Sequence, residues 1–170
     1  MEYKVIRKQY NSDMCFVCGL KNDAGLHTHY YELENQSLLG IFKGHSVHQS
    51  YPERMHGGII SALLDETVGR AIIIFEPDTW GVTAELTIRY LKPVPLHEEL
   101  RVVGKITNIR SRLFEGEGYV CDTKNNILAT CTGKYIKQSV KAIVNDNQFV
   151  EEEWIYVEDS IPPLSFDLPK

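Results

Sequence analysis

The stretch of sequence that decides the fold prediction is His56-Gly57-Gly58-Ile59-Ile60-Ser61-Ala62-Leu63-Leu64-Asp65. A histidine and two glycines stand at the expected start of a hydrophobic helix, and one carboxylate follows two to three turns later. Glycine leaves backbone N–H groups uncovered, and a helix N-terminus presents those donors together with a partial positive charge. A carboxylate inside an apolar helix is costly to bury. The pattern therefore predicts a site that polarises a carbonyl group, which Asp65 attacks directly or through water.

The apolar residues predict a helix from about Gly57 to Phe75, which Glu76-Pro77-Asp78 ends because proline cannot continue a helix. One broad apolar face is formed by Ile60, Leu63, Leu64, Thr67, Ala71, Ile74 and Phe75. Apolar residues on the other sides predict a buried helix. Asp65 lies beside the broad face, so we expect it in or next to a low-dielectric pocket. Glu66 points elsewhere and precedes Arg70 by one turn, which predicts an ion pair on the helix flank.

The rest of the chain favours β-structure. Residues 1–12 are expected to form a short helix or a lead-in. Strands are predicted over 27–33, 38–43, 81–91, 100–110, 113–122 and 127–135. In the segment 81–91, strict alternation places Val82, Ala84, Leu86, Ile88 and Tyr90 on one face and Thr83, Glu85, Thr87 and Arg89 on the other. One long helix followed by successive antiparallel strands predicts an α+β fold with the helix packed on one sheet.

Composition and charge narrow the class of protein. The chain of 170 residues has a net charge of -5, and residues 151–170 alone carry six acidic residues and one lysine. The remainder is close to neutral, which argues against a nucleic-acid partner because such a partner requires a basic face. No apolar segment is long enough to span a membrane and no targeting sequence is recognisable, so we expect no membrane partner and a cytoplasmic location. The four cysteines are therefore expected to be reduced thiols.

Several motifs resemble a known family. His56-Gly57-Gly58 with an acid at the ninth position after the histidine is similar to the hotdog-fold acyl-CoA thioesterases, in particular their phenylacetate-pathway (PaaI-like) branch. The other matching segments are Cys15-Phe16-Val17-Cys18-Gly19 with Gly25-Leu26, the run from Gly81 to Pro95, and Leu128-Ala129-Thr130-Cys131-Thr132-Gly133. The resemblance covers about residues 13–137. It implies a hotdog domain over residues 1–138, and residues 139–170 are then a partly ordered acidic C-terminal extension.

The resemblance implies a fold and a mechanism. Hotdog proteins wrap a curved antiparallel β-sheet around one long central helix and pair as dimers, some of which form tetramers. Their sites lie at the dimer interface, where the helix acid of one subunit faces the glycine turn of the other. By this analogy Asp65 activates water or attacks the thioester, and Gly57 and Gly58 hold its oxygen. His56 would order the loop or polarise the carbonyl, and Thr83 would orient water.

The resemblance also suggests how the substrate, an acyl-CoA, is held. Many relatives carry Asn or Gln six residues before the motif histidine, where this chain has Ser50 with Gln49 beside it. Either could take that role. The candidates for contacts with the phosphates of coenzyme A are Arg89, Lys92, Arg110 and Arg112. We expect no cofactor.

The sequence also contains features of a metal site and of two other functions. Cys15-x-x-Cys18 and His27-x-His29 supply ligand types that zinc uses, but their spacing is not that of a standard finger, so we expect no metal. His45 and His48 lie in a loop where they could line the site or face solvent. The alternative function is a non-catalytic hotdog protein that binds acyl-CoA or an acyl-carrier protein. A hydratase or dehydratase is disfavoured because it requires a differently placed His and acid.

Overall fold

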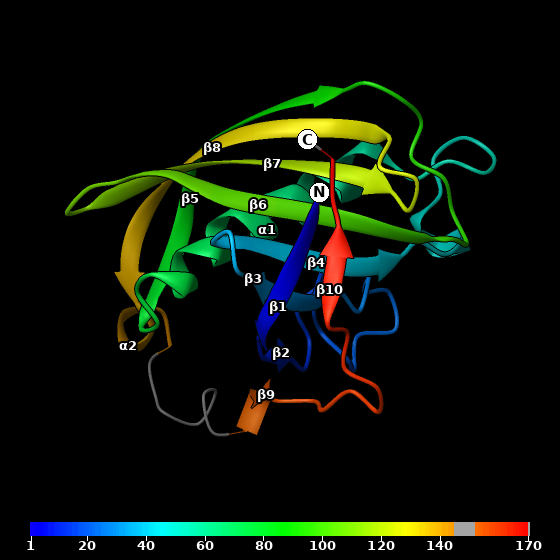
Figure 1. The fold of residues 1–170 in the computed structure, drawn as a ribbon. Helices are drawn as coiled ribbons and strands as arrows, with labels where there is room; N and C mark the ends of the chain where they lie inside the picture. Colours follow the sequence, from blue (N-terminus) through cyan, green and yellow to red (C-terminus); the bar gives the residue numbers. More distant parts are fainter. Residues whose placement is uncertain (145–151, 170) are drawn as a thin grey trace.

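The computed structural model, which describes residues 1–144 and 152–169, consists of one long helix wrapped by a large antiparallel sheet (Figure 1). The strands are β1 (Glu2–Lys8), β2 (Asn11–Ser12), β3 (His29–Leu33), β4 (Ser37–Lys43), β5 (Thr79–Tyr90), β6 (Glu99–Ile109), β7 (Leu113–Asp122), β8 (Ile127–Ser139), β9 (Trp154–Ile155) and β10 (Ser165–Asp167). The helices are α1 (Gly57–Arg70) and α2 (Val140–Ile143), with 3₁₀ turns η1 (Ser46–His48) and η2 (Ala71–Ile74). The prediction of an α+β fold with a central helix and a curved antiparallel sheet is confirmed.

The order of strands in the sheet places β5 at one edge. The order is β10-β1-β3-β4-β6-β7-β8-β5, with every neighbouring pair antiparallel. Strand β5 therefore pairs with β8 on one side and with no described strand on the other. An unpaired edge exposes a row of backbone donors and acceptors that can pair with another chain.

Glycines in the sheet allow α1 to lie very close to it. A Cβ atom on Gly104 of β6 would stand 2.8 Å from the Thr67 carbonyl oxygen, and one on Gly116 of β7 would stand 2.6 Å from Val68 Cγ1. Both separations are below a tolerable contact, so a side chain at either position would push the helix away. The close approach buries Leu63, Leu64 and Val68 completely, and burial of such side chains is the main favourable term in folding.

The helix deviates from the sequence prediction only at its C-terminal end. The α-helical part ends at Arg70, and the predicted continuation is the 3₁₀ turn η2. Of the predicted apolar face, the residues up to Ala71 are buried, Ile74 is half-buried and Phe75 is exposed. The tighter winding of a 3₁₀ turn shifts the direction of each later side chain, so a wheel drawn for an α-helix misplaces them.

The prediction for residues 1–12 is wrong, because they form strands and not a helix. Strand β1 pairs with β3 on one side and with β10 on the other, and β2 pairs with β9. Side chains of β1 and β10 cover a second apolar cluster on the outer face of the sheet, which includes Tyr31, Leu39, Val103 and Phe166. These partners are far away in the sequence, so local propensity carries no signal for them.

The C-terminal extension is only partly within the described residues, since 145–151 and Lys170 lie outside them. In its described part, β9 and β10 pair with the N-terminal strands and α2 follows β8 directly. The domain boundary at residue 138 stays a prediction. All four cysteines are free thiols. Among the described residues, no helix combines the length and the apolar character needed to cross a bilayer.

Candidate active site

The N-terminus of α1 is fixed by His56 and by two hydroxyl groups. His56 is the N-cap residue, and its Nδ1 accepts a hydrogen bond from the Gly58 N–H (2.9 Å). In neutral His56 the proton must then be on Nε2, which makes that atom a donor. The Gly57 carbonyl accepts hydrogen bonds from Ser61 Oγ (2.9 Å) and Tyr90 OH (3.0 Å). Within the described residues, the Gly57 N–H donates to no protein acceptor.

The loop before the helix is held by His48, which is buried with 1% of its surface exposed. Its Nδ1 accepts from the His45 N–H (2.9 Å) and its Nε2 lies 2.9 Å from the Ala24 carbonyl oxygen. Its own carbonyl accepts the N–H of His56 (2.8 Å). The sequence suggested that His48 would line the site or face solvent, and the structure shows neither. His48 instead positions His56. His45 is exposed.

Asp65 is half-buried and is oriented by two strands. Thr83 Oγ1 donates to Asp65 Oδ1 at 2.7 Å, and Tyr135 OH donates to the main-chain carbonyl of Asp65 at 3.2 Å. Asp65 and Thr83 line one cavity of about 270 Å³ together with Gly69, Gly81 and Trp80. The Thr83 hydroxyl thus bonds one oxygen of the Asp65 carboxylate, and Asp65 borders the cavity.

A bulge in β5 brings Thr83 to the helix. Thr83 pairs with Tyr135 and Glu85 pairs with Lys134, so Ala84 has no partner of its own. The extra residue reverses the alternation, and Thr83 faces α1 together with Leu86, Ile88 and Tyr90. The sequence prediction placed Thr83 on the opposite face from Leu86 and was wrong on this point. A bulge cannot be recognised from a strictly alternating sequence.

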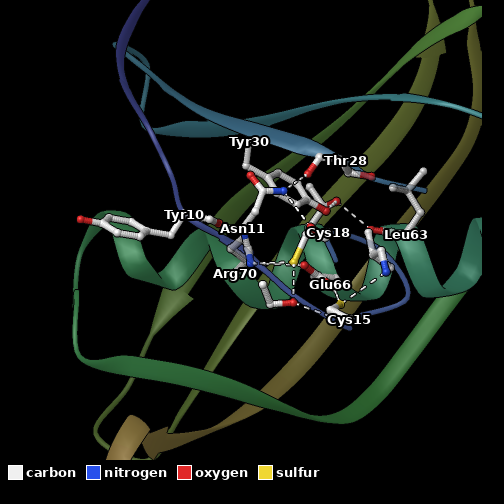
Figure 2. A network of polar contacts seen from close by, with 12 residues as sticks. Tyr10, Asn11, Cys15, Cys18, Thr28, Tyr30, Leu63, Glu66 and Arg70 are labelled. Atoms are coloured by element: carbon white, nitrogen blue, oxygen red, sulfur yellow. Dashed lines mark hydrogen bonds and ion pairs between the residues drawn. The ribbon is translucent and has the colours of Figure 1, made fainter. Parts of the chain in front are cut away.

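Glu66 belongs to a buried polar network and not to a solvated flank (Figure 2). The predicted ion pair is present, with Arg70 Nη2 3.4 Å from Glu66 Oε1. Cys15 Sγ donates to Glu66 Oε2 (2.8 Å), and Arg70 Nη2 donates to Cys18 Sγ (3.2 Å). Burial raises the pKa of Glu66 to about 8, and the charge of Arg70 opposes this rise. His27 and His29 are not part of the group that contains the two cysteines.

The predicted substrate-binding residues are all exposed and do not gather in one place. Lys92 follows the C-terminal end of β5, near the start of α1. Arg110 and Arg112 lie in the turn between β6 and β7, next to the end of β5 that carries Thr83. Arg89 faces a separate cavity of about 560 Å³ that includes Lys105 and Tyr119.

Gln49 and Ser50 lie in the exposed loop before α1. The Gln49 side chain accepts from the Glu53 N–H (3.3 Å), and the Ser50 N–H donates to the Arg54 carbonyl (2.9 Å). Within the described residues, neither side chain contacts Asp65. Three hydroxyl groups that were not predicted hold the main chain of the predicted site residues, and they belong to Ser61, Tyr90 and Tyr135. The contacts of Tyr90 and Tyr135 follow from the position of their strands beside the helix. Ser61 lies in α1 four residues after Gly57, a spacing at which a serine can bond the carbonyl of the preceding turn.

Comparison with known proteins agrees with the fold. A family model described as "Thioesterase superfamily" matches residues 53–129, which include the start of α1, Asp65 and Thr83. A crystal structure of a thioesterase superfamily protein superimposes with a TM-score of 0.67 at 26% identity, covering 72% of this chain and 59% of that one. The chain therefore has the hotdog fold, and its residues 53–129 are similar to the thioesterase superfamily.

Two further proteins are similar to this chain. The PaaI protein of E. coli, from its phenylacetic acid degradation operon, is similar in fold with a TM-score of 0.60 at 14% identity, covering 67% of this chain and 81% of that one. The mouse acyl-coenzyme A thioesterase THEM4 is 30% identical over 83 residues, which are 49% of this chain and 35% of that protein. The matched stretch thus spans about a third of that curated relative.

Proposed function

We propose that this hotdog protein hydrolyses acyl-CoA thioesters to a free acid and CoA. The observation that carries the proposal is the Asp65 carboxylate, which borders a cavity and is oriented by Thr83 at 2.7 Å. A thioester needs little more than a general base and a stabilised oxyanion, because the thiolate is a good leaving group. The similarity to an acyl-coenzyme A thioesterase supports CoA as the carrier.

Asp65 acts in this proposal as a general base on water. Thr83 occupies Oδ1, so the other carboxylate oxygen is free to accept a proton. The water oxygen attacks the carbonyl carbon as its proton passes to Asp65, and the negative charge collects on the former carbonyl oxygen. Collapse of this intermediate breaks the C–S bond, and the CoA thiolate leaves and takes up a proton. Direct attack by Asp65 would instead form an acyl-Asp65 anhydride, which rapid quenching and hydroxylamine trapping would reveal by mass spectrometry.

The Gly57 N–H is the donor that stabilises the oxyanion. It is the uncommitted donor at the positive end of α1, whereas the Gly58 N–H is already donated to His56. His56 contributes as the cap of the helix, and in this proposal its Nε2–H serves as a second donor to the same oxygen. Removal of one oxyanion donor costs about 10²–10³ in rate in other enzymes.

The two halves of the site must come from different copies of the chain. Asp65 follows Gly57 by eight residues, which corresponds to about 12 Å along an α-helix. One carbonyl group cannot contact both, since each contact requires about 3 Å. A homodimer that brings α1 of one copy to β5 and Asp65 of the other resolves this conflict, and a tetramer of such dimers is compatible with it. The exposed edge of β5, with Val82 45% and Tyr90 54% exposed, is the surface for that contact.

The direct test compares wild type with Asp65→Asn on a panel of aliphatic and aromatic acyl-CoAs, following release of free thiol. We expect kcat/KM to fall by about 10²–10⁴-fold, the usual contribution of a general base. Asp23→Asn, which changes an exposed carboxylate elsewhere, is the matched control and should retain full activity. If wild type and Asp65→Asn hydrolyse every substrate equally, the enzyme proposal fails. Tight acyl-CoA binding in that case would favour the non-catalytic binding protein.

A further inference from the structure

Three ligand atoms of the buried network lie together. Cys15 Sγ, Cys18 Sγ and a Glu66 carboxylate oxygen are all within 4.8 Å of one another. The cysteines come from the turn before β3, and Glu66 comes from α1 (Figure 2). Two sulfurs and one carboxylate oxygen at such separations are a donor set that tetrahedral zinc sites use.

The turn that carries the cysteines is built to bring both sulfurs to one side. The Gly19 N–H donates to the Cys15 carbonyl (2.8 Å), and the Val17 N–H donates to Cys15 Sγ (3.4 Å). A Cβ atom at residue 19 would lie 2.3 Å from the Cys15 carbonyl oxygen, so only glycine fits. Ser12 Oγ lies 3.7 Å from Cys18 Sγ. Donors of this kind orient the ligands of a metal and stabilise thiolates.

One oxygen of the network has an incomplete set of partners. Glu66 Oε1 is buried and forms no hydrogen bond with a described residue, and its printed contact is the ion pair with Arg70 Nη2 at 3.4 Å. A bound cation would supply this oxygen with a second partner. Buried charges and buried polar atoms are costly unless they are paired or coordinated.

A redox-active dithiol is the competing interpretation of Cys15-x-x-Cys18. Exchange with an external disulfide requires a sulfur that the partner can reach. Cys18 has only 1% of its surface exposed and is covered by Arg70, and Cys15, which is half-buried, donates its proton to Glu66. The burial of Cys18 favours a ligand role.

We propose that Cys15, Cys18 and Glu66 bind one Zn²⁺ ion. Zinc is favoured over harder ions by the two thiolates. The fourth coordination position belongs to water in the cavity of about 270 Å³ that these residues line with Asp65. Each cysteine that is protonated in the free protein releases one proton to solvent as its Zn–S bond forms. The ion would link the Cys15–Gly19 turn to α1 through Glu66, the residue that follows Asp65. This proposal does not depend on the proposed hydrolysis.

The test uses the full chain, purified under reducing conditions and dialysed against a chelator, and titrates it with Co²⁺ as a spectroscopic substitute for zinc. We expect one equivalent of Co²⁺ to produce a sulfur-to-cobalt charge-transfer band, which one equivalent of Zn²⁺ then abolishes. Cys15→Ser and Cys18→Ser should lose the band, and Glu66→Gln should keep it with weaker binding. Cys131→Ser, which changes a buried thiol outside the group, is the control and should behave like wild type.

A second measurement covers the case in which the serine variants do not fold. In wild type, Zn²⁺ should protect Cys15 from alkylation by iodoacetamide, measured by peptide mass spectrometry, whereas Mg²⁺ should not. Absence of both the cobalt band and this protection would overturn the proposal. So would a Cys15–Cys18 disulfide that forms with glutathione disulfide while Zn²⁺ is present. Asp65→Asn should bind the ion as wild type does, which separates failure of the metal site from failure of the hydrolase proposal.

Discussion

At the scale of single residues, the candidate site depends on main-chain groups as much as on side chains. The sequence pointed to Asp65, His56 and the two glycines, because a buried acid and a glycine pair are unusual in an apolar helix. It did not indicate that Gly58 is already bonded to His56, or that Tyr90 and Ser61 hold the Gly57 carbonyl. The contacts of His56 and Ser61 are local, but each is one of several bonds that such a side chain can form near a helix start. The Tyr90 contact depends on which strand lies beside the helix, and local sequence does not encode that.

Gly57→Pro tests the oxyanion donor with little other change. Proline lacks the N–H and is well tolerated at the first position of a helix. His56 has φ -64° and ψ 134°, which is close to the conformation required before proline. The atoms nearest to a Cβ at residue 57 belong to Tyr90, at 3.5 to 3.6 Å, which is an ordinary van der Waals contact. We expect kcat to fall by about 10²–10³-fold, while Gly57→Ala, which keeps the N–H, should retain most activity. Equal activity of the two variants would show that this N–H plays no part.

Thr83→Val removes the hydroxyl that orients Asp65 and preserves the shape of the side chain. A hydrogen bond to a charged group contributes about 1.5–3 kcal/mol, so we expect kcat to fall by roughly 10- to 100-fold with KM little changed. Thr87→Val, on the opposite face of β5, is the matched control. The assigned role of Thr83 would be refuted if both variants lost activity equally, or if neither did.

At the scale of elements, the helix and the central strands were predictable because their patterns are long and local. Two features were not. The bulge at Ala84 reverses the alternation of β5 and decides that Thr83, and not Val82, meets Asp65. The N-terminal strand β1 depends on β3 and β10, which lie far along the chain. Both features are decided by strand pairing and not by the propensity of the residues themselves.

The close approach of α1 to the sheet gives a stability prediction. Gly116→Ala places a methyl group 2.6 Å from Val68 Cγ1, and we expect it to lower the free energy of unfolding by about 1–3 kcal/mol. Val68→Ala alone should also destabilise the protein, because it leaves a cavity. The double variant should be less destabilised than the sum of the two, because the new methyl group partly fills that cavity. Urea denaturation of the four proteins measures this coupling, and strict additivity would contradict the packing.

At the scale of the whole molecule, the described sheet ends in the long strand β5 at one edge and in the three-residue strand β10 at the other. The β5 edge lies beside both parts of the candidate site, with Thr83 near one end and Tyr90 at the other. In the proposed dimer, a second copy paired along β5 supplies the half of the site that Gly57 and Asp65 of one chain are too far apart to form alone. Each proposed dimer then contains two sites.

The measurement that tests this account most directly is complementation between two inactive variants. Gly57→Pro and Asp65→Asn are each purified, mixed in equal amounts under conditions that allow subunits to exchange, and assayed for thiol release. If the site is shared, half of the dimers contain both variants and each of these has one intact site, so activity should recover to about a quarter of the wild-type value. If subunit exchange is verified by mass spectrometry and the mixture is no more active than the two variants separately, the shared site is contradicted.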